Sequence, residues 1–173
     1  MLHKNKLKIM KLFFDEPSKN FQIREISRLT KIAVTSVKKY LNELLKDDLL
    51  MKDKKTLYPS YVANQQNRIF KIHKQQLILL ELYTSGLIDL LKEELHPKCI
   101  FLFGSMSKGE YDKTSDIDLF VQCEERKINV SKFENKLKHN INIFFENNLS
   151  NLSNELFNNI INGVKIDGYL KLK

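Results

Sequence analysis

Residues 99–122 read CIFLFGSMSKGEYDKTSDIDLFVQ, and this stretch decides the fold of the surrounding chain. Its first apolar run, residues 100–103, ends at Gly104 and predicts a buried strand. A second apolar run, residues 119–121, predicts another strand. Between them lies a loop that begins with glycine and serine and ends with acidic residues.

Two carboxylates, Asp116 and Asp118, stand where the second strand begins. Side chains at i and i+2 of a strand point to one face, so these two are expected side by side. Like charges held that close repel, and Mg²⁺ (or Mn²⁺) is a usual compensation for paired oxygen ligands. Gly104 permits a close backbone approach, while the Ser105 hydroxyl and the amides after it can hold phosphate. The stretch therefore predicts a site for a metal ion and a phosphate-bearing ligand.

The composition sets broad limits on the protein's class. With 173 residues, the chain is long enough for one domain or two small ones. No apolar run approaches the ~20 residues of a membrane span, and no signal-peptide apolar region follows the basic N-terminus. Two cysteines are too few for a disulfide framework. These features predict a cytoplasmic protein with reduced cysteines and no membrane partner.

The positive charge is unevenly distributed along the chain. Residues 1–63 hold 14 Lys and Arg against 7 Asp and Glu, a net charge of +7, whereas residues 64–173 hold 15 against 14. A basic N-terminal part beside a nearly neutral remainder indicates a polyanionic partner, such as nucleic acid, for the former.

The N-terminal part reads as three short helices followed by two strand-like runs. Helical spacing of apolar residues predicts helices over residues 6–14, 21–29 and 34–46, with a turn at 31–33. Short strands are expected at residues 49–51 and 57–62, with a basic tip at 52–55 between them.

This order of elements resembles a winged helix-turn-helix domain and covers residues 1–63. The glycines that such domains often carry in the turn and before the wing are absent, since Thr30 and Lys31 stand in the turn and Asp48 stands before the wing. The resemblance implies a third helix in the major groove and wing lysines on phosphates. The expected DNA-binding residues are Thr35, Ser36, Lys38, Lys39, Lys52, Lys54 and Lys55. The alternative is a lysine-rich module that serves only for dimerisation or docking.

The residues 104–109, GSMSKG, and 115–119, SDIDL, resemble the signature of the DNA polymerase β superfamily, most closely its minimal nucleotidyltransferases. The resemblance implies an α+β fold for residues 87–173, with a small mixed sheet flanked by helices. It also implies transfer of a nucleoside monophosphate from a nucleoside triphosphate to a hydroxyl group on a protein or nucleic acid. Lys108, where the family often has arginine, would then help to neutralise the triphosphate. Residues 64–86 would form a linker helix, which is also long enough to be a homodimer seam.

The family usually has a third carboxylate on the next strand, where it helps to activate the acceptor hydroxyl. Here that strand is expected at residues 141–145, and the matching position is Asn142, which cannot act as a base. Glu146 is the nearby acid, beyond the strand. Two functions follow: a metal-dependent nucleotidyltransferase coupled to a DNA-binding module, or a weak or inactive nucleotide-sensing transcriptional regulator. The resemblance adds the context of prokaryotic toxin–antitoxin systems.

Overall fold

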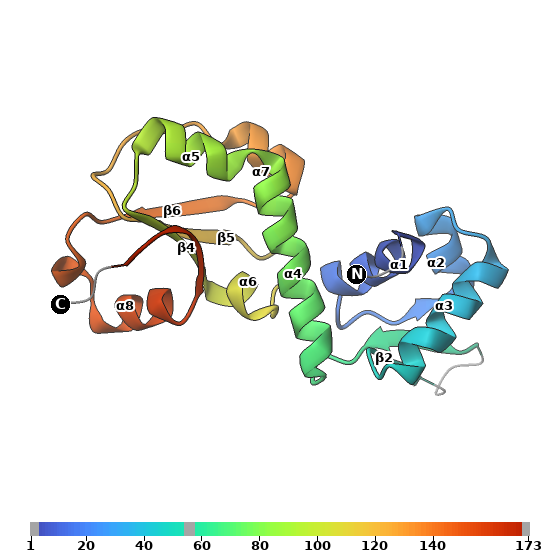
Figure 1. Cartoon of the computed structure of the whole chain (residues 1–173). Helices are drawn as coiled ribbons and strands as arrows, with labels where there is room; N and C mark the ends of the chain where they lie inside the picture. Colours follow the sequence, from blue (N-terminus) through green and yellow to red (C-terminus); the bar gives the residue numbers. More distant parts are fainter. Residues whose placement is uncertain (1–3, 54–57, 171–173) are drawn as a thin grey trace. The chain divides into compact units, whose positions relative to one another are not determined.

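The computed structural model describes residues 4–53 and 58–170, which fall into two compact units, Met1–Ile72 and His73–Lys173 (Figure 1). The boundary lies inside the long helix α4 (Arg68–Ser85), so that helix contributes residues to both units. No helix within the described ranges is both long and apolar enough to cross a bilayer. Each unit is described separately below.

The first unit combines three helices with a small antiparallel sheet. Its helices and strands follow one another as α1 (Lys4–Asp15), β1 (Phe21–Gln22), α2 (Ile23–Thr30), α3 (Val34–Lys46), β2 (Leu50–Asp53) and β3 (Ser60–Ala63). The strand order in the sheet is β1-β3-β2. Helix α3 has the predicted bounds, and the expected tip residues Lys54 and Lys55 lie outside the described residues.

The prediction of a helix over residues 21–29 is wrong at its beginning. Phe21 and Gln22 form β1 and pair with Tyr61 and Ser60 of β3. The cause is packing: Phe21 is fully buried, with its ring centroid 5.1 Å from that of Phe13 in an edge-to-face contact. A two-residue strand is too short to leave an alternating pattern in the sequence.

Two residues of this unit adopt the left-handed backbone conformation at the positions where the glycines of the winged-helix pattern are missing. Lys31 ends α2 with φ 57°, and Asp48 follows α3 with φ 55°. Side chains with a Cβ are disfavoured in this region. The turns therefore have the geometry that a glycine would adopt, although neither residue is glycine.

We expect Lys31→Gly to stabilise the first unit by about 0.5–1 kcal/mol, because relief of the left-handed strain exceeds the entropy that glycine loses on folding. Thermal unfolding of the full chain measures the change. The matched control is Lys39→Gly in the interior of α3, which should destabilise by about 1 kcal/mol. Equal destabilisation by both substitutions would show that Lys31 is not strained.

The second unit is built on a four-stranded mixed sheet. After α4 its elements are α5 (Leu87–Leu95), β4 (Cys99–Phe103), α6 (Gly104–Lys108), β5 (Ile117–Val121), α7 (Ser131–Leu137), β6 (Ile141–Phe145), the 3₁₀ turn η1 (Leu149–Asn151), α8 (Asn154–Ile161) and β7 (Val164–Gly168). The strand order is β6-β5-β4-β7, with β5 and β6 parallel and the other pairs antiparallel. The predicted mixed sheet and the predicted pairing of the first two strands are confirmed.

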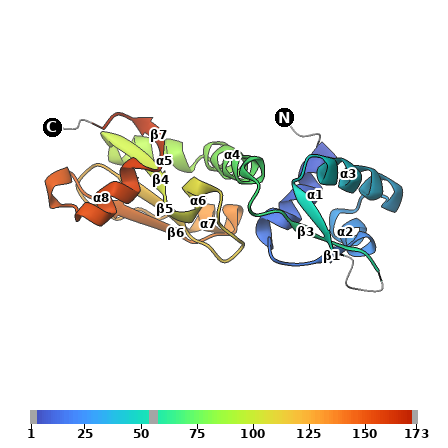
Figure 2. The ribbon, with the colours of Figure 1, turned by 90° about the horizontal axis from the view of Figure 1, so that it is seen from below.

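Alternating side chains of this sheet supply two apolar layers. One face of the sheet packs its Ile100, Leu102 and Leu119 against α4, α5 and α7. The opposite face packs Phe101, Phe103 and Phe120 with Ile160 of α8. Figures 1 and 2 show the helices on these two sides of the strands. The 3₁₀ turn η1 and helix α8 are separate elements, because the Ser153 hydroxyl accepts a hydrogen bond from the Leu156 amide (3.2 Å) and caps the beginning of α8.

Candidate active site

The register of the sheet gathers the predicted site residues at one end of β5. Asp118 lies opposite Phe103 of β4 on one side and opposite Asn142 of β6 on the other. Asp116 immediately precedes β5, where the Ile117 amide donates to the Asn140 carbonyl at 2.8 Å. Both aspartates are half-buried. The two carboxylates therefore lie on one sheet face, as the i and i+2 spacing predicts.

Two asparagine amides face the two carboxylates across the parallel pair of strands. The Asn142 side-chain amide donates to Asp118 Oδ1 at 3.0 Å and to Asp116 Oδ2 at 3.3 Å. The Asn140 amide donates to Asp116 Oδ1 at 2.9 Å. The sequences Asp-Ile-Asp and Asn-Ile-Asn thus stand in register on neighbouring strands. Hydrogen bonds to carboxylates offset part of the repulsion between the two acids.

Gly104 leaves space for one of these carboxylates. Its φ is +70°, and a Cβ added there would lie 2.5 Å from Asp118 Oδ2. Any other residue at this position would displace the Asp118 carboxylate, and its backbone would also be strained at this positive φ. The close backbone approach predicted at this glycine is made to the carboxylate of Asp118.

We expect Gly104→Ala to destabilise the second unit by about 2–4 kcal/mol and to impair any function of Asp118, because backbone strain and a steric clash coincide. Gly86→Ala is the control for strain alone. Gly86 has φ +88°, but its nearest neighbour would be Phe133 at an ordinary 3.9 Å. Thermal unfolding of the two variants compares them; a smaller loss for Gly104→Ala than for Gly86→Ala would contradict the close approach.

Side chains from one turn of α4 form hydrogen bonds with the segments that flank the carboxylates. Lys74 is buried, donates to the Tyr111 carbonyl and lies 4.5 Å from the centroid of the Tyr111 ring. The Tyr111 hydroxyl in turn donates to the Lys74 carbonyl at 3.1 Å. Gln75 donates to the Ser107 carbonyl of α6. Helix α4 therefore holds both α6 and the loop that leads to Asp116.

A compact turn completes this loop. The Asp112 carboxylate accepts hydrogen bonds from the Thr114 hydroxyl at 2.7 Å and from the Thr114 amide at 2.8 Å. These hydrogen bonds hold the pKa of Asp112 below its usual value. The His139 ring, which lies edge-on to Tyr111, donates from Nδ1 to the Ser115 carbonyl at 2.7 Å. Ser115, the residue before Asp116, is therefore also held by His139, which lies just ahead of β6.

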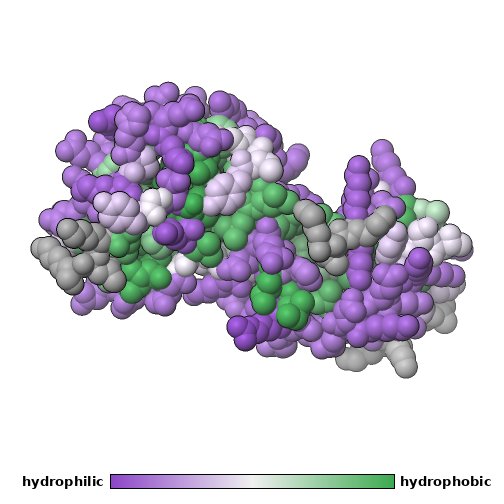
Figure 3. Space-filling model, in the orientation of Figure 1, coloured by the Kyte–Doolittle hydropathy of each residue, from purple (hydrophilic) through white to green (hydrophobic). Residues whose placement is uncertain are grey.

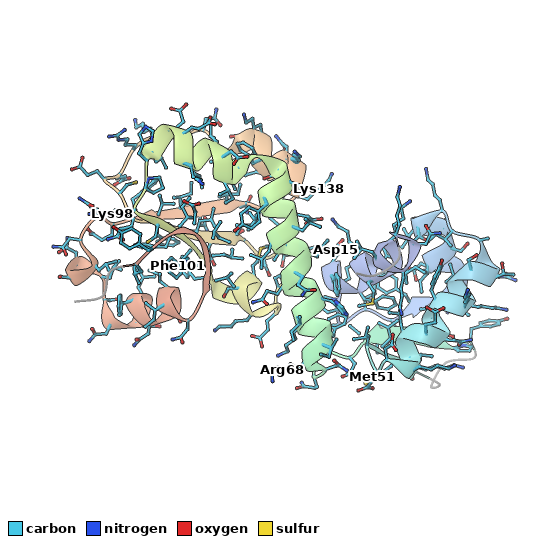
Figure 4. The ribbon with its side chains drawn as sticks, in the orientation of Figure 1. Asp15, Met51, Arg68, Lys98, Phe101 and Lys138 are labelled. Atoms are coloured by element: carbon cyan, nitrogen blue, oxygen red, sulfur yellow. The ribbon has the colours of Figure 1, made fainter. Side chains whose placement is uncertain are left out.

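A polar hollow of about 410 Å³ opens beside Asp116. Asn140, His139 and Lys138 line it together with Ser131 of α7. Figure 4 labels Lys138 at the end of α7 and Lys98 ahead of β4, at opposite ends of the sheet. The hollow therefore belongs to the end of the sheet that carries the carboxylates.

The remaining residues of the predicted site lie on α6 or after β6. Ser105 is half-buried and Lys108 is exposed, both on α6. Glu146 follows β6 and is four residues beyond Asn142, which is about 13 Å along an extended chain. Its carboxylate accepts a hydrogen bond from the Asn148 amide at 2.8 Å. Glu146 is therefore not a member of the carboxylate group. Among the described residues, no three His, Cys, Asp or Glu side chains cluster in a way that could hold a metal ion.

In the first unit, most of the residues predicted to contact DNA are accessible. Thr35, Lys38, Lys39 and Lys52 are exposed, and Ser36 is half-buried. In the view of Figure 3 the side chains of this unit are mostly hydrophilic. A hollow of about 410 Å³ lies at the beginning of α3, and Lys38 lines it with Arg24 and Tyr58. Lys54 and Lys55 fall outside the part of the chain that the structure describes.

Sequence reasoning missed the role of Asn140 and of the buried Lys74. Asn140 had a detectable signal, since Asn140 and Asn142 repeat the i and i+2 spacing of the aspartates. Lys74 had none, because a lysine within an amphipathic helix pattern is normally read as exposed.

Comparison with known proteins bears on the second unit. Residues 86–168 match the family model described as "Polymerase beta, Nucleotidyltransferase". No curated protein and no solved structure matches the chain. The matched range contains the four strands of the mixed sheet and the site at Gly104, Asp116 and Asp118. This match supports a polymerase β-type nucleotidyltransferase domain at residues 86–168.

Proposed function

We propose that the second unit binds a nucleoside triphosphate with a divalent cation and transfers its nucleoside monophosphate to a hydroxyl group on a protein or nucleic acid. The observation that carries the proposal is the pair of half-buried carboxylates on one sheet face, with Gly104 packed against Asp118. Two adjacent negative charges attract a cation, and the cation attracts a triphosphate.

The donor set fits one Mg²⁺ or Mn²⁺. Such an ion is commonly held by one or two carboxylates, with substrate phosphates and water as its other ligands. Asp116 and Asp118 would be its protein ligands. When bound, the ion neutralises the triphosphate and stabilises the charge that develops on the transferred phosphoryl group.

The chain's own residues divide the remaining tasks. The Ser105 hydroxyl and the neighbouring amides bind the phosphates, and Lys108 adds a positive charge. The hollow beside Asp116 receives the acceptor, because its polar lining suits a hydroxyl-bearing group and it adjoins the carboxylates. Asn142 holds the two carboxylates in place but cannot take a proton from the acceptor. Transfer is therefore slow unless the acceptor ionises without help.

A second candidate function is a nucleotide-responsive DNA-binding regulator, and Asn142 favours it. The amide that replaces the third acid preserves the arrangement of Asp116 and Asp118 while removing a base. Such a site binds nucleotide without turnover. In a toxin–antitoxin setting, the transferase would act on a second protein.

Transfer can be tested with α-labelled ATP, CTP, GTP and UTP, Mg²⁺ and cell extract, followed by separation of labelled macromolecules. A labelled product that requires the intact chain and Asp118 supports the transferase. Nucleotide binding without any labelled product supports the regulator, and the absence of both binding and labelling rejects the proposed site.

We further propose that residues 1–63 form a winged helix-turn-helix domain that binds DNA. The order helix, strand, helix, helix, strand, strand and the antiparallel sheet β1-β3-β2 support it. The exposed Lys38 and Lys39 on α3 and the net charge of +7 over residues 1–63 provide the electrostatic attraction. Thr35 and Ser36, at the beginning of α3, would face the base edges.

Lys38→Ala with Lys39→Ala should weaken binding to a DNA duplex and make the dependence of log Kd on log salt shallower by about two, because two phosphate contacts are lost. Fluorescence anisotropy over a salt series measures both effects. The matched control replaces Lys127 and Lys165, exposed lysines of the second unit, by alanine. If the two double variants behave alike, α3 is not the DNA-binding helix.

A further inference from the structure

Phe144 on β6 exposes a large part of an aromatic ring beside the carboxylates. The residue is 42% exposed, whereas Phe101, Phe103 and Phe120 on the same sheet face are almost fully buried. Its ring lies edge-to-face against Phe103, with centroids 5.4 Å apart. The three buried phenylalanines pack with Ile160 of α8. This packing does not account for the exposed aromatic ring of Phe144.

The register places this ring directly next to the site. Phe144 lies two residues beyond Asn142 on the same face of β6, a separation of about 7 Å along the strand. It pairs with Phe120, which is two residues beyond Asp118 on β5. The polar hollow at Asp116 and Asn140 lies toward the beginnings of the same two strands. Along the strands, Phe144 and the hollow therefore lie on opposite sides of the Asp118–Asn142 pair.

We propose that Phe144 is the stacking platform for the nucleobase of the bound nucleoside triphosphate. The inference rests on the proposed function, because it assumes that the carboxylates hold the cation and its triphosphate. With the acceptor in the polar hollow, the nucleoside extends the other way, over Phe144. An aromatic face binds any base but favours the larger purine ring, so ATP and GTP bind more tightly than CTP and UTP.

The charge beside Phe144 argues for a nucleotide rather than a protein surface. A protein that covered this ring would also cover Asp116 and Asp118, and burying carboxylates without a compensating cation is costly. A nucleotide brings a divalent cation with it. Among the described residues of β5 and β6, Phe144 is the exposed large apolar side chain, and one ring is small for a stable interface between two chains but sufficient for one base.

Calorimetry with two ligands tests the platform: MgATP, and magnesium tripolyphosphate, which lacks base and sugar. Phe144→Ala should weaken MgATP binding about tenfold and leave tripolyphosphate binding unchanged. Phe144→Trp should preserve MgATP affinity. Because the chain has no tryptophan, the new indole is the sole tryptophan fluorophore, and MgATP should quench it while tripolyphosphate does not. The matched control is Tyr169→Trp. Tyr169 is 73% exposed, and its amide donates to the Lys98 carbonyl, at the opposite end of β4 from Phe103.

The possible outcomes separate the platform from the site itself. If both ligands bind wild type and Phe144→Ala changes neither affinity, or changes both equally, the nucleobase does not stack on Phe144 and the proposal is overturned while the phosphate and metal site stands. If neither ligand binds wild type, the proposed function fails and the platform fails with it. Quenching in Tyr169→Trp equal to that in Phe144→Trp would also overturn the proposal.

Discussion

Asn142→Asp should raise nucleotide transfer by about 10²–10⁴-fold, the usual contribution of a positioned general base. The substitution restores an acid on β6 directly opposite Asp118, within reach of Asp116 as well. The gained activity should fall as the pH drops through the pKa of the new carboxyl group, because only its ionised form accepts a proton. Initial rates with labelled nucleotide across a pH series provide the measurement.

Asn140→Asp is the matched control for this gain. It adds the same charge on the same strand face, next to Asp116 but outside the position opposite Asp118. We expect a much smaller gain from it. If Asn142→Asp is as inactive as wild type, the missing acid is not what prevents the reaction. If wild type is active and as fast as Asn142→Asp, the acceptor supplies its own base.

Asp118→Asn should weaken Mg²⁺-dependent binding of nucleoside triphosphate by about 30–100-fold. Removing one unit charge a few ångströms from a divalent ion costs about 2–3 kcal/mol in a partly solvated site. The fold should persist, because an asparagine oxygen can still accept the hydrogen bond from Asn142 and one repulsive charge is gone. Calorimetry with and without Mg²⁺ measures affinity, and circular dichroism verifies the fold.

Asp112→Asn provides the comparison for Asp118→Asn. Asp112 is an acid in the same loop, but its contacts are those of a local turn with Thr114 and Ser115. An asparagine can accept the same hydrogen bonds, so nucleotide binding should stay within about twofold of wild type. Equal losses in the two variants would indicate a general effect of negative charge rather than a metal ligand.

The sequence was sufficient for the features that depend on local pattern. The strand before Gly104, the helix over residues 34–46 and the paired aspartates all follow from periodicity, glycine placement and the i and i+2 rule, and the structure has them. The family resemblance at residues 104–119 is supported by the match over residues 86–168.

The features that were missed depend on contacts between distant segments. Asn140 acquires its role only when β6 aligns with β5 across the intervening α7, and no local pattern fixes that register. The strand at Phe21 and Gln22 forms because Phe21 packs on Phe13 and pairs with Tyr61. Lys74 is buried because a carbonyl and the ring of Tyr111 receive its ammonium group. Sequence periodicity describes which face is apolar but not which polar group will find a partner there.

The position of the cation is best tested by paramagnetic broadening in NMR spectra of the full chain with ATP and substoichiometric Mn²⁺. If Asp116 and Asp118 hold the ion, the first signals to disappear should be the backbone amides of Gly104 and Ser105 and the side-chain amide of Asn142. Signals from Lys98 and Tyr169, at the other end of β4, should persist. Broadening centred on any other group of residues, with the Asn142 side-chain amide unaffected, would contradict the assignment of this site.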